Sequence, residues 1–344
     1  MPQKIGKYTI IRQLGEGGMS IVWEGIEENT QQRVAIKVLK HNLAPETDAV
    51  HRFHREIETS KALSHANIIP ILDVGEENGT HYYVMPLIQG RTLEQILEHE
   101  KISIDLAAHI AIQIALGLQY AHKHGVIHRD IKPSNIMITE TQVFIMDFGL
   151  ARPEWVARLT LSGTLLGTPS YMSPEQIQGL CYVDQRTDIY SLGVTLYQML
   201  TGHLPFSYQN LSDLMYNILY ISPIPPHQWN KDIPANLESI VLKAMHKNPD
   251  RRFESDQQLI NALYKFLCNK HKISTTITQT FYNSFKLYFY KWKSLSIFFI
   301  AMICTIIIEC IIHYIFYYSN LTTLTEIPFV NSFQFIPTLP HIIK

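Results

Sequence analysis

The stretch at 126–138, VIHRDIKPSNIMI, places charged and amide side chains between two apolar ends. Asp130 can accept a proton from an incoming hydroxyl group or orient it. Lys132 can neutralise an anionic oxygen, and Asn135 can ligate a hard cation through its amide oxygen. Taken alone, the stretch is either a solvated surface turn between two strands or a loop held rigid so that its polar groups can work.

A second carboxylate comes directly after an apolar run, in VFIMDFGLA at 143–151. Asp147 is therefore expected at the end of a buried strand, beside Phe148 and Gly149. A carboxylate in this position suits Mg²⁺, which favours oxygen ligands and keeps phosphate groups as partners. A solvated turn around Asn135 would leave this second feature unexplained.

Upstream, LGEGGMSIVWEG at 14–25 lies between two expected strands. Gly15, Gly17 and Gly18 let the backbone turn sharply and approach a ligand closely, with N–H groups available to phosphate oxygens. Because no helix is expected directly after the glycines, the motif is neither a Walker loop nor a dinucleotide-binding fingerprint. A plain β-hairpin is the alternative interpretation.

Lys37 stands alone in the apolar strand VAIKV. A buried ammonium group is costly unless it is paired, and Glu56, in the helical stretch RFHREIETSKAL, offers a partner. The alternative is a lysine whose stem is buried at a strand edge while its head reaches solvent.

The elements that must position these residues follow from hydrophobic periodicity. Short β-branched or alternating runs between residues 8 and 87 predict strands, interrupted by one helical stretch at 49–64. From about residue 92 the apolar spacing is helical, and Gly125 is a helix-stop signal. The helical stretches are 92–100, 106–125, 188–202, 236–247 and 255–270. The expected fold class is α+β, with a small β-rich lobe before a larger helical lobe.

In this order and spacing, the motifs resemble those of the eukaryotic-like serine/threonine protein kinases, most closely the membrane-anchored bacterial type. The resemblance covers roughly residues 8–268. It implies a bilobal protein-kinase fold, with an N-lobe at 8–87 and a C-lobe at 88–268. It also implies transfer of the γ-phosphoryl group of ATP, with Mg²⁺, to Ser or Thr of protein substrates.

The resemblance also assigns roles to individual residues. Asp130 would be the catalytic base with Lys132 beside it, and Asn135 and Asp147 would be the Mg²⁺ ligands. A lysine two residues after the base is similar to the Ser/Thr branch of the family. The residues that the resemblance implies for ATP binding are Leu14, Gly15, Gly17, Gly18, Val22, Ala35, Lys37, Glu56, Met85, Pro86 and Ile88.

The sequence departs from the family pattern in places. Ser20 replaces the third glycine of the loop, and the usual Ala-Pro-Glu is Ser-Pro-Glu at 173–175. By resemblance, Glu175 still pairs with Arg252 to brace the large lobe.

The segment YYVMPLIQG resembles the hinge of the family, with Met85 at the gatekeeper position. Pro86 has no N–H, but in the family this position offers its C=O to adenine, and the N–H comes from the position of Ile88. None of these changes removes a catalytic group.

Two other functions are alternatives to this one. One is a nucleotide-binding membrane scaffold without effective catalysis, a pseudokinase, and the intact polar motifs argue against it. The other is a small-molecule kinase of similar fold. GTPSYMSPE at 167–175 argues against it, because this segment resembles a protein-substrate platform.

Arg129 precedes the expected base, and in kinases with this arginine a phosphate on the activation loop typically pairs with it. The loop at 150–172 offers Thr160, Ser162 and Thr164, so autophosphorylation at one or more of them is expected. An ordinary polar loop face is the alternative. Thr168 is expected to bond within the catalytic loop.

Composition bounds the remaining possibilities. The chain has 344 residues, 46% hydrophobic and 17% charged, with a formal net charge of −1. This length allows one large domain or two average ones, and the balanced charge gives no general attraction to nucleic acid. The four cysteines, Cys181, Cys268, Cys304 and Cys310, show no CxxC spacing, which predicts buried thiols in a reducing compartment. The first residues contain no long apolar run, so no signal peptide is expected.

Residues 295–316 are apolar except for Glu309 and His313. A helix of this length is ~33 Å long, which matches a bilayer core, so a transmembrane helix is predicted. A buried helix of a soluble core is the alternative. The linker at 269–293 carries five lysines and no acid, which orients the kinase domain to the cytoplasm and leaves 317–344 as a short extracytoplasmic tail.

Glu309 is costly inside a membrane span and is therefore a candidate functional residue. It is expected either to pair two helices, giving a homodimer, or to be tolerated as a protonated carboxyl group.

Overall fold

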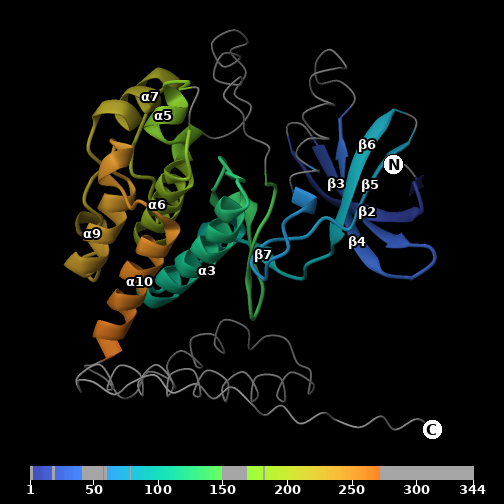
Figure 1. Cartoon of the computed structure of the whole chain (residues 1–344), viewed down its shortest axis with the longest axis horizontal. Coiled ribbons are helices and arrows are strands. Elements are labelled where there is room, and N and C mark those ends of the chain that lie inside the picture. Colours follow the sequence, from blue (N-terminus) through green and yellow to red (C-terminus); the bar gives the residue numbers. More distant parts are fainter. Residues whose placement is uncertain are drawn as a thin grey trace, which may run out of the picture. The chain divides into compact units, whose positions relative to one another are not determined.

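A six-stranded antiparallel sheet with the strand order β1-β2-β3-β4-β6-β5 forms the N-terminal lobe. Figure 1 labels β2 to β6 in this lobe. The computed structural model of the chain describes residues 3–17, 20–40, 57, 60–77, 79–148, 169–180 and 183–271. The strands are β1 Lys4–Ile5, β2 Tyr8–Glu16, β3 Ser20–Glu27, β4 Arg33–Leu39, β5 Asp73–Glu77 and β6 Thr80–Pro86. β1 was not predicted from the sequence. β2, β3, β4 and β6 match the predicted runs closely, whereas β5 does not.

Strand β4 is buried along most of its length because β3 and β6 cover both of its edges. Trp23, Val34, Ile36, Tyr82 and Val84 belong to the core cluster of the sheet. The strand predicted at 68–75 begins only at Asp73, and this prediction was wrong by five residues.

The late start of β5 has a physical reason. Pro70 has no N–H to donate to a sheet. The residues before it pair elsewhere: Ile68 forms a parallel bridge with Ile145, and the Ile69 N–H donates to the Ile145 carbonyl at 3.1 Å. This backbone pairing joins Ile68 and Ile69 of the N-lobe to the strand that leads to Asp147.

The C-terminal lobe is helical around α3 and α6. The helices are α2 Leu93–His99, α3 Ile104–Lys123, α5 Pro174–Ile177, α6 Arg186–Thr201, α7 Leu211–Tyr220, α8 Pro226–Trp229, α9 Ala235–Ala244 and α10 Asp256–His271. Short 3₁₀ turns lie at Pro133–Asn135, Pro169–Tyr171 and Pro249–Arg251. The five predicted helical stretches are confirmed, whereas α5, α7 and α8 were missed.

Helix α3 begins where the Ser103 side chain accepts a hydrogen bond from the Leu106 N–H. It ends before Gly125, whose φ of 74° is left-handed, as the stop signal predicts. Within the described part of the chain, α3 is the helix long and apolar enough to cross a membrane, but 56% of this stretch is buried inside the protein. It packs against α6 and α10, so it is a core helix of the lobe.

A small second sheet supports the polar loop between the two lobes. Its strands are β7 Arg91–Thr92, β8 Ile136–Ile138 and β9 Val143–Ile145. The loop with Asp130 comes before β8, and Asp147 follows β9, so the β8–β9 pairing brings the two motifs to the same edge.

Candidate active site

The glycine-rich segment is the tip of the β2–β3 hairpin. Gly15 lies opposite Val22, and the Gly17 N–H donates to the Ser20 carbonyl at 2.8 Å, which closes the turn. A Cβ added at Gly15 would meet no atom within 4 Å, so the backbone there is open to a ligand. Gly18 lies outside the described residues.

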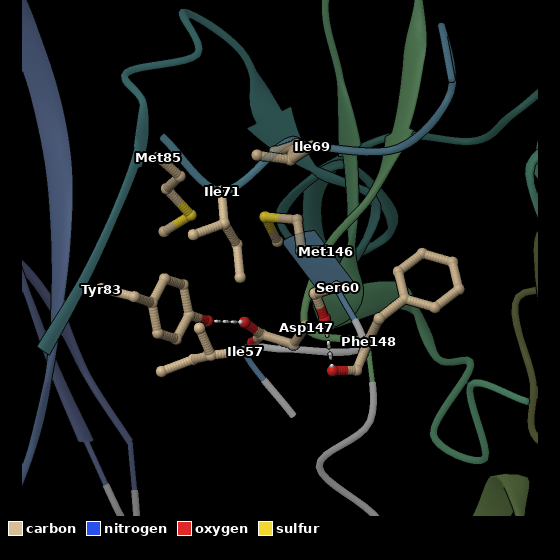
Figure 2. Close-up of a pocket in the computed structure, with 9 residues that line it drawn as sticks. All are labelled: Ile57, Ser60, Ile69, Ile71, Tyr83, Met85, Met146, Asp147 and Phe148. Atoms are coloured by element: carbon tan, nitrogen blue, oxygen red, sulfur yellow. Dashed lines mark hydrogen bonds between the residues drawn. The ribbon is translucent and has the colours of Figure 1, made fainter. Parts of the chain in front are cut away.

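Lys37 is buried in β4, and its Nζ lies 2.5 Å from the Asp147 Oδ1. The Tyr83 hydroxyl of the neighbouring strand donates to the same oxygen at 2.8 Å (Figure 2). Burial raises the pKa of Asp147, but the charge of Lys37 and the hydrogen bonds from Lys37 and Tyr83 outweigh it, so the pKa is lowered. Asp147 is therefore an ionised, oriented carboxylate. Glu56, the partner of Lys37 expected from the sequence, lies outside the described residues.

A pocket opens beside this carboxylate and is mostly apolar (Figure 2). Its lining comes from Ile57, Ser60, Ile69, Ile71, Tyr83, Met85, Met146, Asp147 and Phe148. Met85 lies opposite Ala35 in the β4–β6 pairing, and Pro86 follows at the end of β6. The predicted gatekeeper, Met85, thus lies beside two predicted ATP-binding residues, Ala35 and Pro86. Ile88 follows two residues after Pro86.

The loop with Asp130 is held by hydrogen bonds to helix α6 and to the segment before Asp147. The backbone N–H groups of His128 and Arg129 donate to the two oxygens of Asp188, at 2.8 and 2.7 Å. The His128 ring bonds through Nε2 to the Met146 carbonyl at 2.8 Å, which joins the loop to the segment before Asp147. Arg129 takes a left-handed φ of 66°, a conformation that costs energy and persists only where the surroundings hold it.

Three side chains of this loop that were predicted to take part in catalysis contact one another: Asp130, Lys132 and Asn135. Lys132 Nζ lies 2.7 Å from Asp130 Oδ2, and the Asn135 amide nitrogen donates to the same oxygen at 3.0 Å. Because the nitrogen of Asn135 faces Asp130, its amide oxygen is directed away from that contact and can ligate a cation.

Asn135 and Asp147 are also tied through the backbone, since the Met146 N–H donates to the Asn135 carbonyl at 2.9 Å. Two oxygen donors from adjacent segments fit Mg²⁺, which binds a few protein ligands and completes its shell with phosphate and water. The described residues contain no cluster of three or more His, Cys, Asp or Glu that could hold a metal ion. The residues present therefore fit a shared metal–phosphate site better than an all-protein cage.

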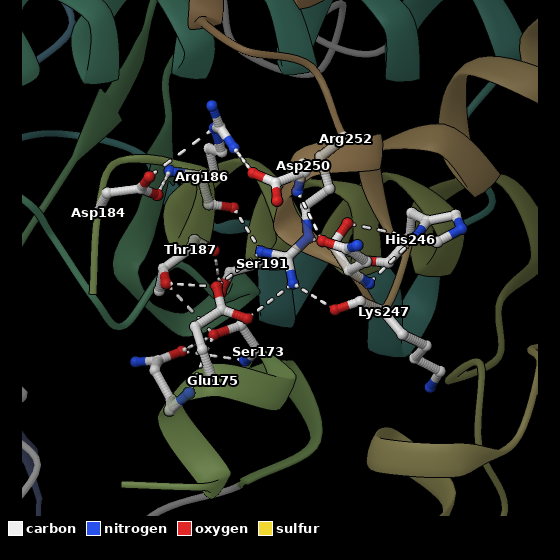
Figure 3. Close-up of polar contacts among 12 residues, drawn as sticks. Ser173, Glu175, Asp184, Arg186, Thr187, Ser191, His246, Lys247, Asp250 and Arg252 are labelled. Atoms are coloured by element: carbon white, nitrogen blue, oxygen red, sulfur yellow. Dashed lines mark hydrogen bonds and ion pairs between the residues drawn. The ribbon is translucent and has the colours of Figure 1, made fainter. Parts of the chain in front are cut away.

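The predicted brace of the large lobe is confirmed (Figure 3). Arg252 Nη1 and Nη2 lie 2.6 and 2.7 Å from the two oxygens of Glu175. Thr187 donates to Glu175 at 2.7 Å. Burial raises the pKa of Glu175, but the hydrogen bonds and charge of Arg252 outweigh it and hold the pKa low.

Sequence reasoning missed the residues that support the loop. Asp188 had only its place in the first turn of α6 as a signal, and its role depends on contacts with residues about sixty positions away. His122 lies between Asp188 and Asp256, with ring nitrogens 2.8 and 2.6 Å from their carboxylates. Tyr83 gave no signal beyond a strand propensity.

Several sequence predictions fall outside the described residues and stay predictions. They concern Gly149, the candidate phosphosites Thr160, Ser162 and Thr164, the role of Thr168, three of the four cysteines (Cys181, Cys304 and Cys310), the linker at 272–293, the span at 295–316 with Glu309, and the tail at 317–344. The fourth cysteine, Cys268, is a free thiol at the exposed side of α10, so the prediction that it is buried was wrong.

The bilobal fold, together with the polar loop and the pocket beside Asp147, defines a protein kinase domain. The family model described as protein kinase domain matches residues 8–264, and the chain belongs to this family.

Curated relatives of the chain carry serine/threonine-kinase names. The chain is 36% identical over 259 residues to a probable serine/threonine-protein kinase of Clostridium acetobutylicum, and 34% identical over 256 residues to PrkC of Bacillus subtilis. It is 37% identical over 267 residues to PknB of Mycolicibacterium smegmatis. These alignments cover 74–75% of this chain but only 39–43% of those proteins. Among solved structures, the PknI kinase domain of Mycobacterium tuberculosis matches with a TM-score of 0.62 at 26% identity, covering 76% of this chain and 96% of that one.

Proposed function

We propose that this protein is a serine/threonine protein kinase that transfers the γ-phosphoryl group of ATP to Ser or Thr of protein substrates. One observation carries the proposal. Asp130, Lys132 and Asn135 converge on one rigid loop, and the backbone of that loop is bonded to the segment before Asp147. The serine/threonine kinases to which the chain is similar support the same reaction.

The residues divide the reaction between them. Asp130 is placed to orient the substrate hydroxyl and accept its proton, while Lys132 beside it neutralises charge on the transferred phosphoryl group. Lys37 binds the phosphates from the N-lobe side, and the tip of the hairpin that carries Gly15 and Gly17 covers them. Asn135 and Asp147 hold Mg²⁺, which when bound supplies charge neutralisation to the phosphates. Catalysis here consists mostly of positioning and electrostatic stabilisation.

The proposal is tested with the purified full-length protein, labelled ATP and Mg²⁺. Label on phosphoserine or phosphothreonine is expected for the natural chain, and its loss is expected for Asp130→Asn and Lys37→Ala. Nucleotide binding without transfer would favour the scaffold alternative, and label on a small molecule alone would favour the small-molecule kinase.

We also propose activation by autophosphorylation of the loop at 150–172. Arg129 Nε is buried and makes no hydrogen bond within the part of the chain that the structure describes, which leaves a donor for a phosphate. Mass spectrometry is expected to find phosphate on Thr160, Ser162 or Thr164. A fully active protein without phosphate on this loop contradicts the proposal.

A membrane anchor at 295–316, with the kinase domain in the cytoplasm, is proposed from the apolar sequence and the lysines that precede it. Recovery of the chain in the membrane fraction after an alkaline wash supports it, and recovery in the soluble fraction contradicts it. A homodimer through Glu309 predicts weaker self-association and autophosphorylation for Glu309→Leu in membranes.

A further inference from the structure

Tyr83 lies directly across from Lys37 in the β4–β6 strand pair. Side chains that lie opposite each other in an antiparallel pair share one face of the sheet and are close neighbours. The Lys37 Nζ accordingly lies 5.7 Å from the centroid of the Tyr83 ring. Both side chains reach the same atom, Asp147 Oδ1, at 2.5 and 2.8 Å. Figure 2 shows the contact from Tyr83.

The backbone on both sides of Asp147 is fixed by other contacts. The Met146 N–H donates to the Asn135 carbonyl, and the Ser60 hydroxyl donates to the Phe148 carbonyl at 3.2 Å. Asp147 itself has a left-handed φ of 58°, which is uncommon for a non-glycine residue. The orientation of its carboxylate is then decided by the side chains that donate to it, Lys37 and Tyr83 among the described residues.

The two donors differ in charge, and that difference matters when a nucleotide binds. Lys37 is a cation that ATP phosphates attract away from Asp147, and it competes with Mg²⁺ for the carboxylate. The Tyr83 hydroxyl is neutral and belongs to a buried, rigid side chain with two rotatable χ angles. It can stay on Oδ1 while Oδ2 turns to a metal ion, because each carboxylate oxygen accepts more than one contact.

We propose that Tyr83 is a positioning residue that holds the Asp147 carboxylate in its metal-binding orientation after Lys37 has moved to the nucleotide. The inference rests on the proposed function, because it takes Asp147 as a metal ligand. A preoriented ligand pays less ordering entropy on binding, so Tyr83 lowers the Mg²⁺ concentration that the cleft requires.

The test uses purified full-length protein and measures binding of a non-hydrolysable ATP analogue by calorimetry across a series of Mg²⁺ concentrations. Tyr83→Phe removes one oxygen and keeps the ring. It is expected to raise the Mg²⁺ concentration for half-maximal nucleotide binding about fivefold, in line with the net contribution of one typical hydrogen bond. It is also expected to lower the melting temperature of the protein without Mg²⁺ and nucleotide, because the bond is present in this state.

Tyr82→Phe is the matched control. Tyr82 is equally buried, but it belongs to the core cluster on the other side of the sheet, while Tyr83 packs with Ile57. Its Mg²⁺ requirement is expected to stay within about twofold of that of the natural chain.

An unchanged or lower Mg²⁺ requirement in Tyr83→Phe overturns the inference, and so does an equal rise in both variants. A lower requirement would mean that the hydroxyl competes with the metal instead of preparing its ligand. If the natural chain itself shows no Mg²⁺-dependent nucleotide binding, the proposed function fails, and this outcome is distinct from a failure of the inference alone.

Discussion

Two buried ion pairs in this protein are built in opposite ways. The Arg252–Glu175 pair is closed: side-chain exposures are 0% and 7%, and Arg252 also donates to the carbonyls of His246, Arg186 and Lys247 (Figure 3). The Lys37–Asp147 pair is open: it borders a pocket, and the side chain of Asp147 is 21% exposed. In the closed pair, the polar atoms of Arg252 find their hydrogen-bond partners inside the protein, as expected for a pair that supports the fold. In the open pair, Lys37 and Asp147 lie where a bound substrate could replace one partner with another.

Breaking the closed pair is expected to have the largest effect on stability. Arg252→Ala leaves the Glu175 carboxylate buried without its partner, so the free energy of unfolding should fall by about 3–5 kcal/mol. Arg252→Lys should recover little of this loss, because an ammonium group cannot make two parallel bonds to a carboxylate. Denaturant unfolding of the purified chain measures both, and a loss below ~1 kcal/mol for Arg252→Ala contradicts the comparison.

Breaking the open pair should affect activity more than folding. Asp147→Asn keeps an acceptor for Tyr83 and Lys37 but removes the negative charge of the proposed metal ligand. Phosphotransfer should fall about 10²–10³-fold, as for other groups that stabilise charge at the transition state. The midpoint of denaturant unfolding should change less than it does for Arg252→Ala. The comparison fails if Asp147→Asn lowers the free energy of unfolding as much as Arg252→Ala does.

His122, which lies between Asp188 and Asp256, gives a third case for the comparison. Its contacts are buried like those of Arg252, but its charge depends on pH. Burial lowers the pKa of His122, yet its hydrogen bonds to Asp188 and Asp256 outweigh this effect and raise the pKa to about 10. The folded pKa lies above the unfolded one, so this stabilisation is fully present below about pH 6.5 and is lost as the pH rises toward 10.

The unfolding free energy of the natural chain should therefore fall by about 3–4 kcal/mol between pH 7 and 10 as this contribution is lost. Asp256→Asn removes one of the two charges that hold the proton and so lowers the folded pKa of His122. The decline should therefore be smaller and be complete at a lower pH. Unfolding titrations at several pH values measure both, and parallel curves for the two proteins would show that Asp256 does not hold the proton.

The smallest effect is expected at an exposed pair in the same neighbourhood. Arg186 Nη1 lies 2.7 Å from Asp250 Oδ1, but the side chain of Asp250 is 83% exposed. Asp250→Ala should change the unfolding free energy by less than about 0.5 kcal/mol, because solvent screens such pairs. A loss comparable to that of Arg252→Ala would show that burial does not separate the two pairs.

The sequence was informative where a pattern is local. Short apolar runs rich in β-branched or aromatic residues located β4 and β6, and helical periodicity located α3 and α6. The spacing of the polar motifs located Asp130, Asn135 and Asp147. Short or weakly periodic elements, such as β1 and α8, carry too few residues to show a period.

What the sequence could not show were roles that arise from tertiary contacts. The Tyr83 hydroxyl meets Asp147 because of strand register, across 64 positions of the chain. His122 meets Asp256 across 134 positions, where two helices pack. The strand predicted at 68–75 was shortened for the same reason, since its first residues pair with β9.

The most direct test of the central claim is affinity labelling with an acyl-phosphate derivative of ATP, which transfers its acyl group to lysines that lie at the phosphates. Mass spectrometry of the labelled full-length protein should find the modification on Lys37 and Lys132, and ATP with Mg²⁺ should suppress it. Labelling spread over exposed lysines without protection by ATP would contradict the claim that these groups surround one nucleotide.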